Sequence, residues 1–228
     1  MSRMEEIKLF CKEYVNTYNL NITPKIKKKR KIGVVAYINS AECYNKRLYR
    51  IYLNSEYIHC GIGFLRSVIF HEMTHIADTI TFQNLPYKDF IMTMSAYSEI
   101  HAAEIEFDAK LGYDKEFITL QSQVWGATKF FTVEESILNQ VEEFKNSYYY
   151  NSFENLLYVI GYVRCLKKYN INYAQELLNQ LPQFDFVHEY IKSLINSESI
   201  DRKIALEMFS ILQDYRKQGK VMITNLKL

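Results

Sequence analysis

The strongest chemical signal in this chain of 228 residues is the run His71-Glu72-Met73-Thr74-His75. Residues four apart in a helix lie one above the other on the same face, so His71 and His75 can bind one metal ion. Glu72 is turned about 100° from His71 around the helix axis, which places it beside the ion rather than behind it. There it can take a proton from a water molecule that the metal activates. The motif predicts two ligands and a general base, and Zn²⁺ suits imidazole and carboxylate ligands with an open position.

A third protein ligand must come from elsewhere, and the acid-rich stretch Ser98–Asp108 offers four candidates: Glu99, His101, Glu104 and Glu106. Small residues share the helical stripe of Glu99, so this helix could approach the metal helix closely enough for a short carboxylate arm to reach the ion. Glu104 lies with His101 on a polar face, which by default is exposed to solvent. We therefore prefer Glu99 as the third ligand and keep Glu104 as the alternative.

Asp78 lies on the same helical stripe as the two histidines, three residues after His75. It could accept a hydrogen bond from a ligand histidine and orient the ring, which is the role we favour. It could also be the third ligand itself, or a polar residue near the end of the helix. Stabilisation of a developing oxyanion usually comes from a Tyr, His or Arg across the cleft. Tyr97 and His101 are near in sequence, but 19 tyrosines leave that assignment open.

Two helices must position these residues. Helical periodicity places the motif on a helix from about Gly63 to Thr81, with a separate apolar stripe for the core made of Leu65, Ile69, Met73, Ile76 and Ile80. The second helix is expected from about Asp89 to Leu111, where Gly112 stops it.

The rest of the chain predicts a small sheet and many helices. A helix is expected over residues 3–18, a solvated basic loop over Lys25–Lys31, and strands over Ile32–Ile38 and Leu48–Leu53. After Gly112 helical patterns recur at about 115–125, 133–146, 151–168, 172–181, 184–196 and 200–218, the first of them ending near Trp125. The predicted fold class is α+β and predominantly α-helical. Residues 1–112 would form a compact core with the metal site, and residues 113–228 a helical region packed on that core.

The order of these elements resembles the minimal zincin metallopeptidases of the gluzincin type. The similarity covers about residues 45–112: a strand at Arg50–Asn54, the helix with the histidine motif, and a later helix with glutamate. Compact examples are frequent in phages and bacterial mobile elements. The resemblance implies His71 and His75 as ligands, Glu72 as base and Glu99 as third ligand, with an edge strand before the metal helix that pairs with the substrate main chain. Gluzincins often have Glu-x-x-x-Asp on the second helix, and here only Glu104 is followed by an aspartate at that distance.

We expect a zinc-dependent metallopeptidase that acts on a protein or peptide substrate. A restricted form of the same function would be a toxin or regulator that cuts a single host protein. The alternative is a non-catalytic phage or mobile-element protein with a structural zinc site, whose helical half binds a partner. Glu72 separates these hypotheses, because a structural site does not need it.

Charge and cysteine usage bear on partners and location. The net charge of +2 gives no global argument for nucleic acid or an acidic membrane. The basic run Lys25–Lys31 could contact phosphates, but it contains no aromatic residues between its basic ones, so we do not expect a nucleic-acid partner. The four cysteines lack CxxC spacing, which is typical of reduced thiols. Without a signal peptide or an apolar run of about 18 residues, we expect a cytoplasmic protein with no membrane contact, or a virion-associated one if a phage encodes it.

Overall fold

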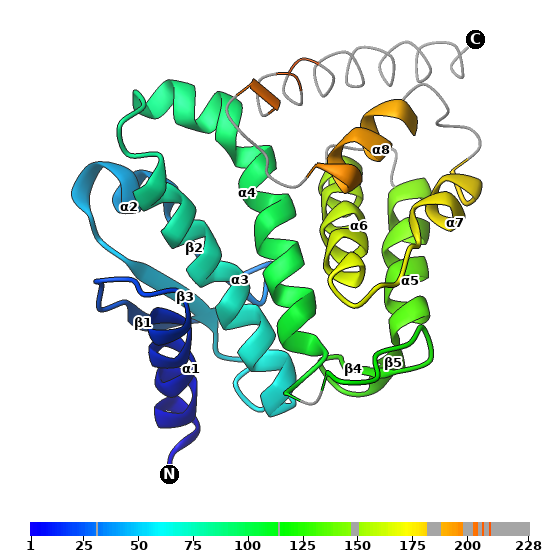
Figure 1. The fold of residues 1–228 in the computed structure, drawn as a ribbon. Helices are drawn as coiled ribbons and strands as arrows, with labels where there is room; N and C mark the ends of the chain where they lie inside the picture. Colours follow the sequence, from blue (N-terminus) through cyan, green and yellow to red (C-terminus); the bar gives the residue numbers. More distant parts are fainter. Residues whose placement is uncertain are drawn as a thin grey trace, which may run out of the picture.

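The computed structural model describes residues 1–30, 32–113, 115–146, 151–181 and 188–197, together with the separate positions 203, 204, 207 and 210. The elements, in chain order (Figure 1), are α1 (Arg3–Thr17), β1 (Lys25–Lys29), β2 (Ala36–Ile38), α2 (Ser40–Lys46), β3 (Arg50–Asn54), α3 (Ile62–Thr81), α4 (Tyr87–Lys110), β4 (Gln123–Trp125), β5 (Phe130–Thr132), α5 (Val133–Asn146), α6 (Asn151–Lys167), α7 (Ala174–Asn179) and α8 (His188–Asn196). The predicted α+β class with a predominance of helix is confirmed. The helix expected over 200–218 lies almost entirely outside the described residues.

The first three strands form a mixed sheet in the order β1-β3-β2. Strand β1 runs parallel to β3, and β2 runs antiparallel to it. Two predictions were wrong here. Residues Lys25–Lys29 of the basic run form a strand rather than a loop, because each of them is paired with a residue of β3. Strand β3 is central rather than an edge, because β1 pairs with one of its edges and β2 with the other.

Strand β2 is shorter than the apolar run that predicted it. The side-chain amide of Asn54 donates hydrogen bonds to the carbonyls of Ile32 (3.0 Å) and Val34 (3.4 Å). These carbonyls therefore bond to a side chain instead of a neighbouring strand, and residues 33–35 form a bend. The remaining strand, Ala36–Ile38, is the sheet edge nearest to α3.

Helices α3 and α4 occur where the sequence predicts them, and α4 ends before Gly112, which has a left-handed φ of 85°. The helix expected over 115–125 was wrong. Its last part is strand β4, which pairs with β5 in a hairpin. Trp125 of β4 stands over the start of α3, because a Cβ atom on Gly63 would lie 2.5 Å from its ring. This contact joins positions far apart in sequence, so a local pattern cannot reveal it.

Helix α4 lies between two hydrophobic clusters. One cluster joins α1, α2, the sheet and α3, and it receives Ile105 and Ala109 from α4. The other joins α4 to α5, α6, α7 and α8. Figure 1 shows α4 between α3 on one side and α6 on the other. The division into domains of residues 1–112 and 113–228 stays a prediction.

All four cysteines are free, as predicted: Cys11, Cys43, Cys60 and Cys165. Among the described helices, none combines the length and the apolar character that a membrane span requires.

Candidate metal centre

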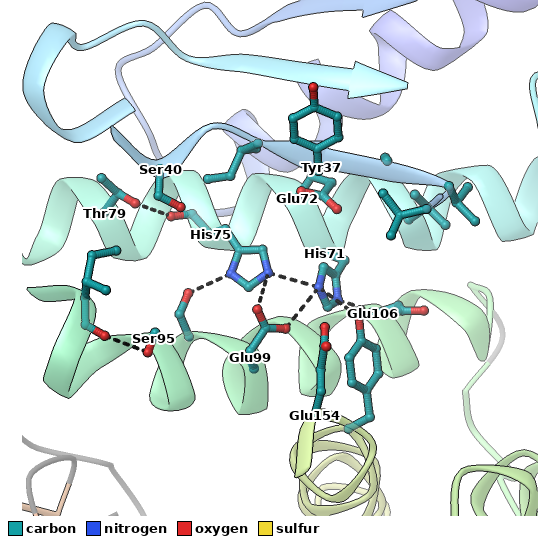
Figure 2. A pocket seen from close by; sticks show the side chains of 18 of the residues that line it. Tyr37, Ser40, His71, Glu72, His75, Thr79, Ser95, Glu99, Glu106 and Glu154 are labelled. Carbon is teal, nitrogen blue, oxygen red and sulfur yellow. Dashed lines mark hydrogen bonds and ion pairs between the residues drawn. The ribbon is translucent and has the colours of Figure 1, made fainter. Parts of the chain in front are cut away.

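Helices α3 and α4 bring His71, His75 and Glu99 together (Figure 2). The Nε2 atoms of the two histidines lie 3.0 Å apart. Oε1 of Glu99 lies 3.5 Å from Nε2 of His75, and Oε2 lies 3.7 Å from Nε2 of His71. Tetrahedral zinc with bonds of about 2.0–2.1 Å places neighbouring ligand atoms roughly 3.3–3.4 Å apart. The three side chains therefore offer ligand atoms within 4.8 Å of one another, close enough to hold one ion.

The charges around this cluster favour a cation. Burial alone would lower the pKa of His71, but the carboxylates of Glu106 and Glu99 outweigh it and raise that pKa well above its usual value. Burial also opposes ionisation of Glu99, yet His75 and His71 lower its pKa. The pKa of His75 is lowered, chiefly by burial, so its neutral form is favoured. A neutral ring can donate its lone pair to a metal, and the carboxylates that attract a proton to His71 would also attract a metal ion.

Glu104 lies away from this cluster. Its carboxylate lies 2.9 Å from Nε of Arg164 and 2.8 Å from Nζ of Lys168. The structure therefore brings Glu99, and not Glu104, to the two histidines. The prediction that the polar face of α4 is solvated was wrong, since Glu104 is only 9% exposed. Arg164 of α6 pairs with the Glu104 carboxylate between the two helices, so that this charge can be buried without solvation by water.

Asp78 supports His75 through Ser98. Nδ1 of His75 lies 2.8 Å from the hydroxyl of Ser98, and that hydroxyl donates to Oδ2 of Asp78 at 2.8 Å. Because Ser98 donates to Asp78, it accepts the Nδ1 proton of His75, and Nε2 is left free to face the site. The other oxygen of Asp78 lies 2.9 Å from Nδ1 of His101. Asp78 thus orients His75 and lies outside the His71–His75–Glu99 cluster, and His101 holds Asp78.

Glu106 holds the outer side of His71. Its Oε2 lies 2.8 Å from Nδ1 of His71, and its Oε1 lies 2.7 Å from Nζ of Lys110. No hydrogen bond of regular geometry forms at this Nδ1, so the contact acts through charge. Burial would raise the pKa of Glu106, but Lys110 and His71 lower it to about 2. The permanent negative charge favours a proton on Nδ1 and leaves Nε2 of His71 facing Glu99.

Glu72 lies on the cleft side of the histidines and is buried. Burial raises its pKa to about 7; Glu99 and Glu106 add to the rise, while His71 and a hydrogen bond from the backbone of Ile38 oppose it. A carboxylate with a pKa near neutrality can both accept and return a proton. The sequence motif predicted Glu72 at the site. The structure adds that its carboxylate accepts a hydrogen bond from the backbone of Ile38, the last residue of β2.

No family model, curated protein or solved structure matches this chain. Any function inferred for the site therefore depends on the geometry and chemistry of its residues.

Helix α6 contributes two residues that the sequence did not reveal. The hydroxyl of Tyr158 lies 3.2 Å from Nε2 of His71, and the two rings stack with centroids 5.2 Å apart. Glu154, one turn earlier, also lines the cleft. The only sequence feature that could have linked Tyr158 and Glu154 is their spacing of four residues, which places them on the same face of one helix. Tyr97, an earlier candidate, packs instead against Phe82 and His101.

The ligands open onto a cleft of about 490 Å³. Residues 34–38, which include β2, form one wall, α3 carries the histidines, and α4 and α6 complete the opposite wall. Phe64, Val68 and Phe90 add apolar surface. Among the described strands, β2 pairs only with β3, so its other edge is unpaired on this sheet. The cleft can therefore admit an extended chain next to the ligand cluster.

Proposed function

We propose that this protein is a zinc-dependent peptidase that hydrolyses peptide bonds in a protein or peptide substrate. The observation that carries the proposal is the position of Glu72, buried beside a His71–His75–Glu99 cluster on an accessible cleft. Three protein ligands with open space next to them are typical of catalytic zinc, whereas structural zinc sites are usually closed by four. The antiparallel edge strand β2 also supports the resemblance to gluzincins.

Each residue has a distinct part in this mechanism. His71, His75 and Glu99 would hold Zn²⁺, which when bound polarises a carbonyl group and acidifies water. Glu72 takes the proton of the attacking water on its carboxylate and transfers it to the leaving amine. The hydroxyl of Tyr158 donates a hydrogen bond to the oxygen on which negative charge develops.

Strand β2 provides a means of positioning the substrate. An extended peptide adds to a free sheet edge through main-chain hydrogen bonds, and such pairing is largely independent of side-chain identity. The apolar cleft residues would then exclude water from the bond that is broken. Because main-chain pairing depends little on the substrate's side chains, the substrate has to be identified by experiment.

The decisive variant is Glu72→Gln. It should retain one zinc per chain, measured by elemental mass spectrometry, because Glu72 is not a ligand. Hydrolysis of a peptide library should fall by about 10²–10⁴-fold, the usual contribution of a general base. Glu99→Gln should lose zinc, and Glu142→Gln, an exposed change on α5, should alter neither property. Cleavage by Glu72→Gln at the wild-type rate would contradict the proposed mechanism. Zinc binding without any cleavage would favour the alternative of a structural site in a partner-binding protein.

A further inference from the structure

The mixed sheet has an outer face that is turned away from the hydrophobic core, and of the residues on it Tyr37 also borders the cleft. Residues paired in register point to the same side of a sheet. Lys25 is paired with Arg50, and Lys27 with Tyr52, which in turn is paired with Tyr37. Ile51 and Leu53 point to the opposite, buried side. The outer face therefore carries basic side chains of β1 beside two tyrosines from β3 and β2.

The two tyrosines form an aromatic platform. Their rings stack with centroids 4.9 Å apart and planes inclined by 18°. The ammonium of Lys29 lies 4.6 Å from the ring centroid of Tyr52 and 5.2 Å from that of Tyr37. Figure 2 shows the ring of Tyr37 pointing away from His71 and His75. Neighbouring strands thus supply the aromatic residues that the basic run itself lacks.

A basic hollow adjoins this platform. It has a volume of about 550 Å³, and its lining includes Arg3, Lys28, Lys29, Arg30 and His59. The described residues that line it include no Asp or Glu. Three acids close to these features have partners: Glu5 accepts a hydrogen bond from the backbone of Ser2, Glu6 pairs with Arg3, and Glu42 binds Tyr52 and Arg50. Lys29 borders both features, so the platform on the outer face and the hollow, which Arg3 of α1 and Lys28 also line, meet at the end of β1.

We propose that this outer sheet face binds single-stranded nucleic acid. Lysines along β1 and the basic hollow would contact phosphates, and the tyrosine platform would stack on an unpaired base. Positive grooves beside aromatic side chains are the usual way in which proteins bind single strands. A duplex keeps its bases stacked inside and leaves the platform unused. A lipid surface offers phosphates but no planar group for the rings. The proposal is independent of the peptidase activity.

The test is fluorescence anisotropy with the full chain and a labelled 20-nucleotide single strand, as DNA and as RNA. A duplex of the same sequence, heparin, and vesicles with and without phosphatidylserine are compared. Single strands should bind at least about tenfold more tightly than the duplex. Tyr52→Leu should weaken that binding by about 5- to 100-fold, the effect of losing one stacked ring. Tyr52→Phe keeps the ring and should bind like the wild type.

The charge contribution has its own matched control. Lys25→Ala/Lys27→Ala should weaken binding and reduce the dependence of log K on log salt by about 1.4, at about 0.7 for each phosphate contact. Lys145→Ala/Lys192→Ala removes the same charge from α5 and α8, across α4 from the sheet, and should change neither. Lys25 and Lys27 are both exposed, so this variant tests the proposal even if Tyr52→Leu unfolds. Equal binding of duplex and heparin, binding of vesicles alone, or no binding would each overturn the proposal.

Discussion

Three buried or half-buried carboxylates of α4 differ in their partners, and the partners decide what each one can do. Glu99 faces two histidines and has room for a metal ion. Glu106 lies between His71 and Lys110 and stays charged. Glu104 pairs with cations of α6 and holds two helices together. The same chemical group thus lies in the candidate metal cluster, beside one of its histidines and in a structural ion pair, all within two turns of helix.

Replacement of Glu104 should reveal its structural role through pH. Burial raises its pKa, but Lys168 and Arg164 outweigh burial and hold the pKa below its ordinary value of 4.5. A lowered folded pKa means that the carboxylate stabilises the fold above about pH 4.5 and that this contribution is lost as the pH falls through the folded pKa. Glu104→Gln should lower the free energy of unfolding by about 2–3 kcal/mol at pH 7.

Urea denaturation at neutral and acidic pH measures this effect. The difference between wild type and Glu104→Gln should narrow as the pH falls below about 4.5. Glu142→Gln, which removes an exposed pair with Lys145, should change stability by less than about 1 kcal/mol. An undiminished difference at the acidic end would mean that packing, not charge, explains the loss.

Residues that depend on helix geometry alone could be predicted from the sequence. Spacing placed His71, His75 and Glu72 on one helix and singled out Glu99 on the next. Ser98 and Tyr158 could be assigned no role, and Glu106 was considered only as a third ligand, because what these residues contact depends on how the helices pack. The polar face of α4 was misjudged for a related reason. A sequence pattern shows which residues share a face, but it does not show that Arg164 lies opposite.

At the scale of elements, α4 and α6 approach each other closely at Gly161. A Cβ atom there would lie 2.5 Å from the carbonyl oxygen of Ile100 and 2.7 Å from Cβ of Ala103. Both neighbours belong to α4, the helix that carries Glu99. The absence of a side chain at one position of α6 therefore sets how closely the two helices of that wall of the cleft approach each other.

Gly161→Ala should destabilise the protein although alanine is the better helix former. The propensity gain of about 0.5–1 kcal/mol is smaller than the overpacking cost of about 1–3 kcal/mol. We expect a net loss of about 1–2 kcal/mol in urea denaturation. Gly33→Ala is the control, since a Cβ atom there meets nothing within 4 Å. A Gly161→Ala protein more stable than the wild type would contradict this account of the interface.

The elements that the sequence did not predict depend on partners distant in the chain. Strand β1 is rich in lysine and forms because β3 lies beside it. Hairpin β4–β5 stands against α3 through Trp125. The bounds of the amphipathic helix α5 were predicted correctly, because its apolar residues recur at helical spacing within one continuous segment. Short strands have no comparable local signal.

At the scale of the whole molecule, the candidate metal centre joins parts of the chain that belong to different hydrophobic clusters. A metal bound to His71, His75 and Glu99 would link α3 to α4, and α4 packs in both clusters. The clusters themselves contain no ligand, so the protein should remain folded without metal. Binding should still stabilise it, because only the folded chain brings the three side chains together.

Removal of metal should therefore lower the melting temperature without unfolding the protein at 25 °C. Free zinc at 100 times its dissociation constant stabilises by about 2.7 kcal/mol, which for a chain of this size corresponds to roughly 5–10 °C. Scanning calorimetry with EDTA and with restored zinc measures the shift. Glu99→Gln should show a much smaller one. Identical melting curves with EDTA and zinc would contradict a bound metal.

The contact between Trp125 and Gly63 also has a consequence for folding during synthesis, because the two residues leave the ribosome at different times. A ribosome releases residues 62–81 well before residue 125, so the start of α3 lacks its cover until more than half of the chain has been made. Tyr158, which stacks on His71, emerges later still. A growing chain thus displays both histidines and Glu99 before the wall around them exists, and only the nearly finished polypeptide holds the whole cleft.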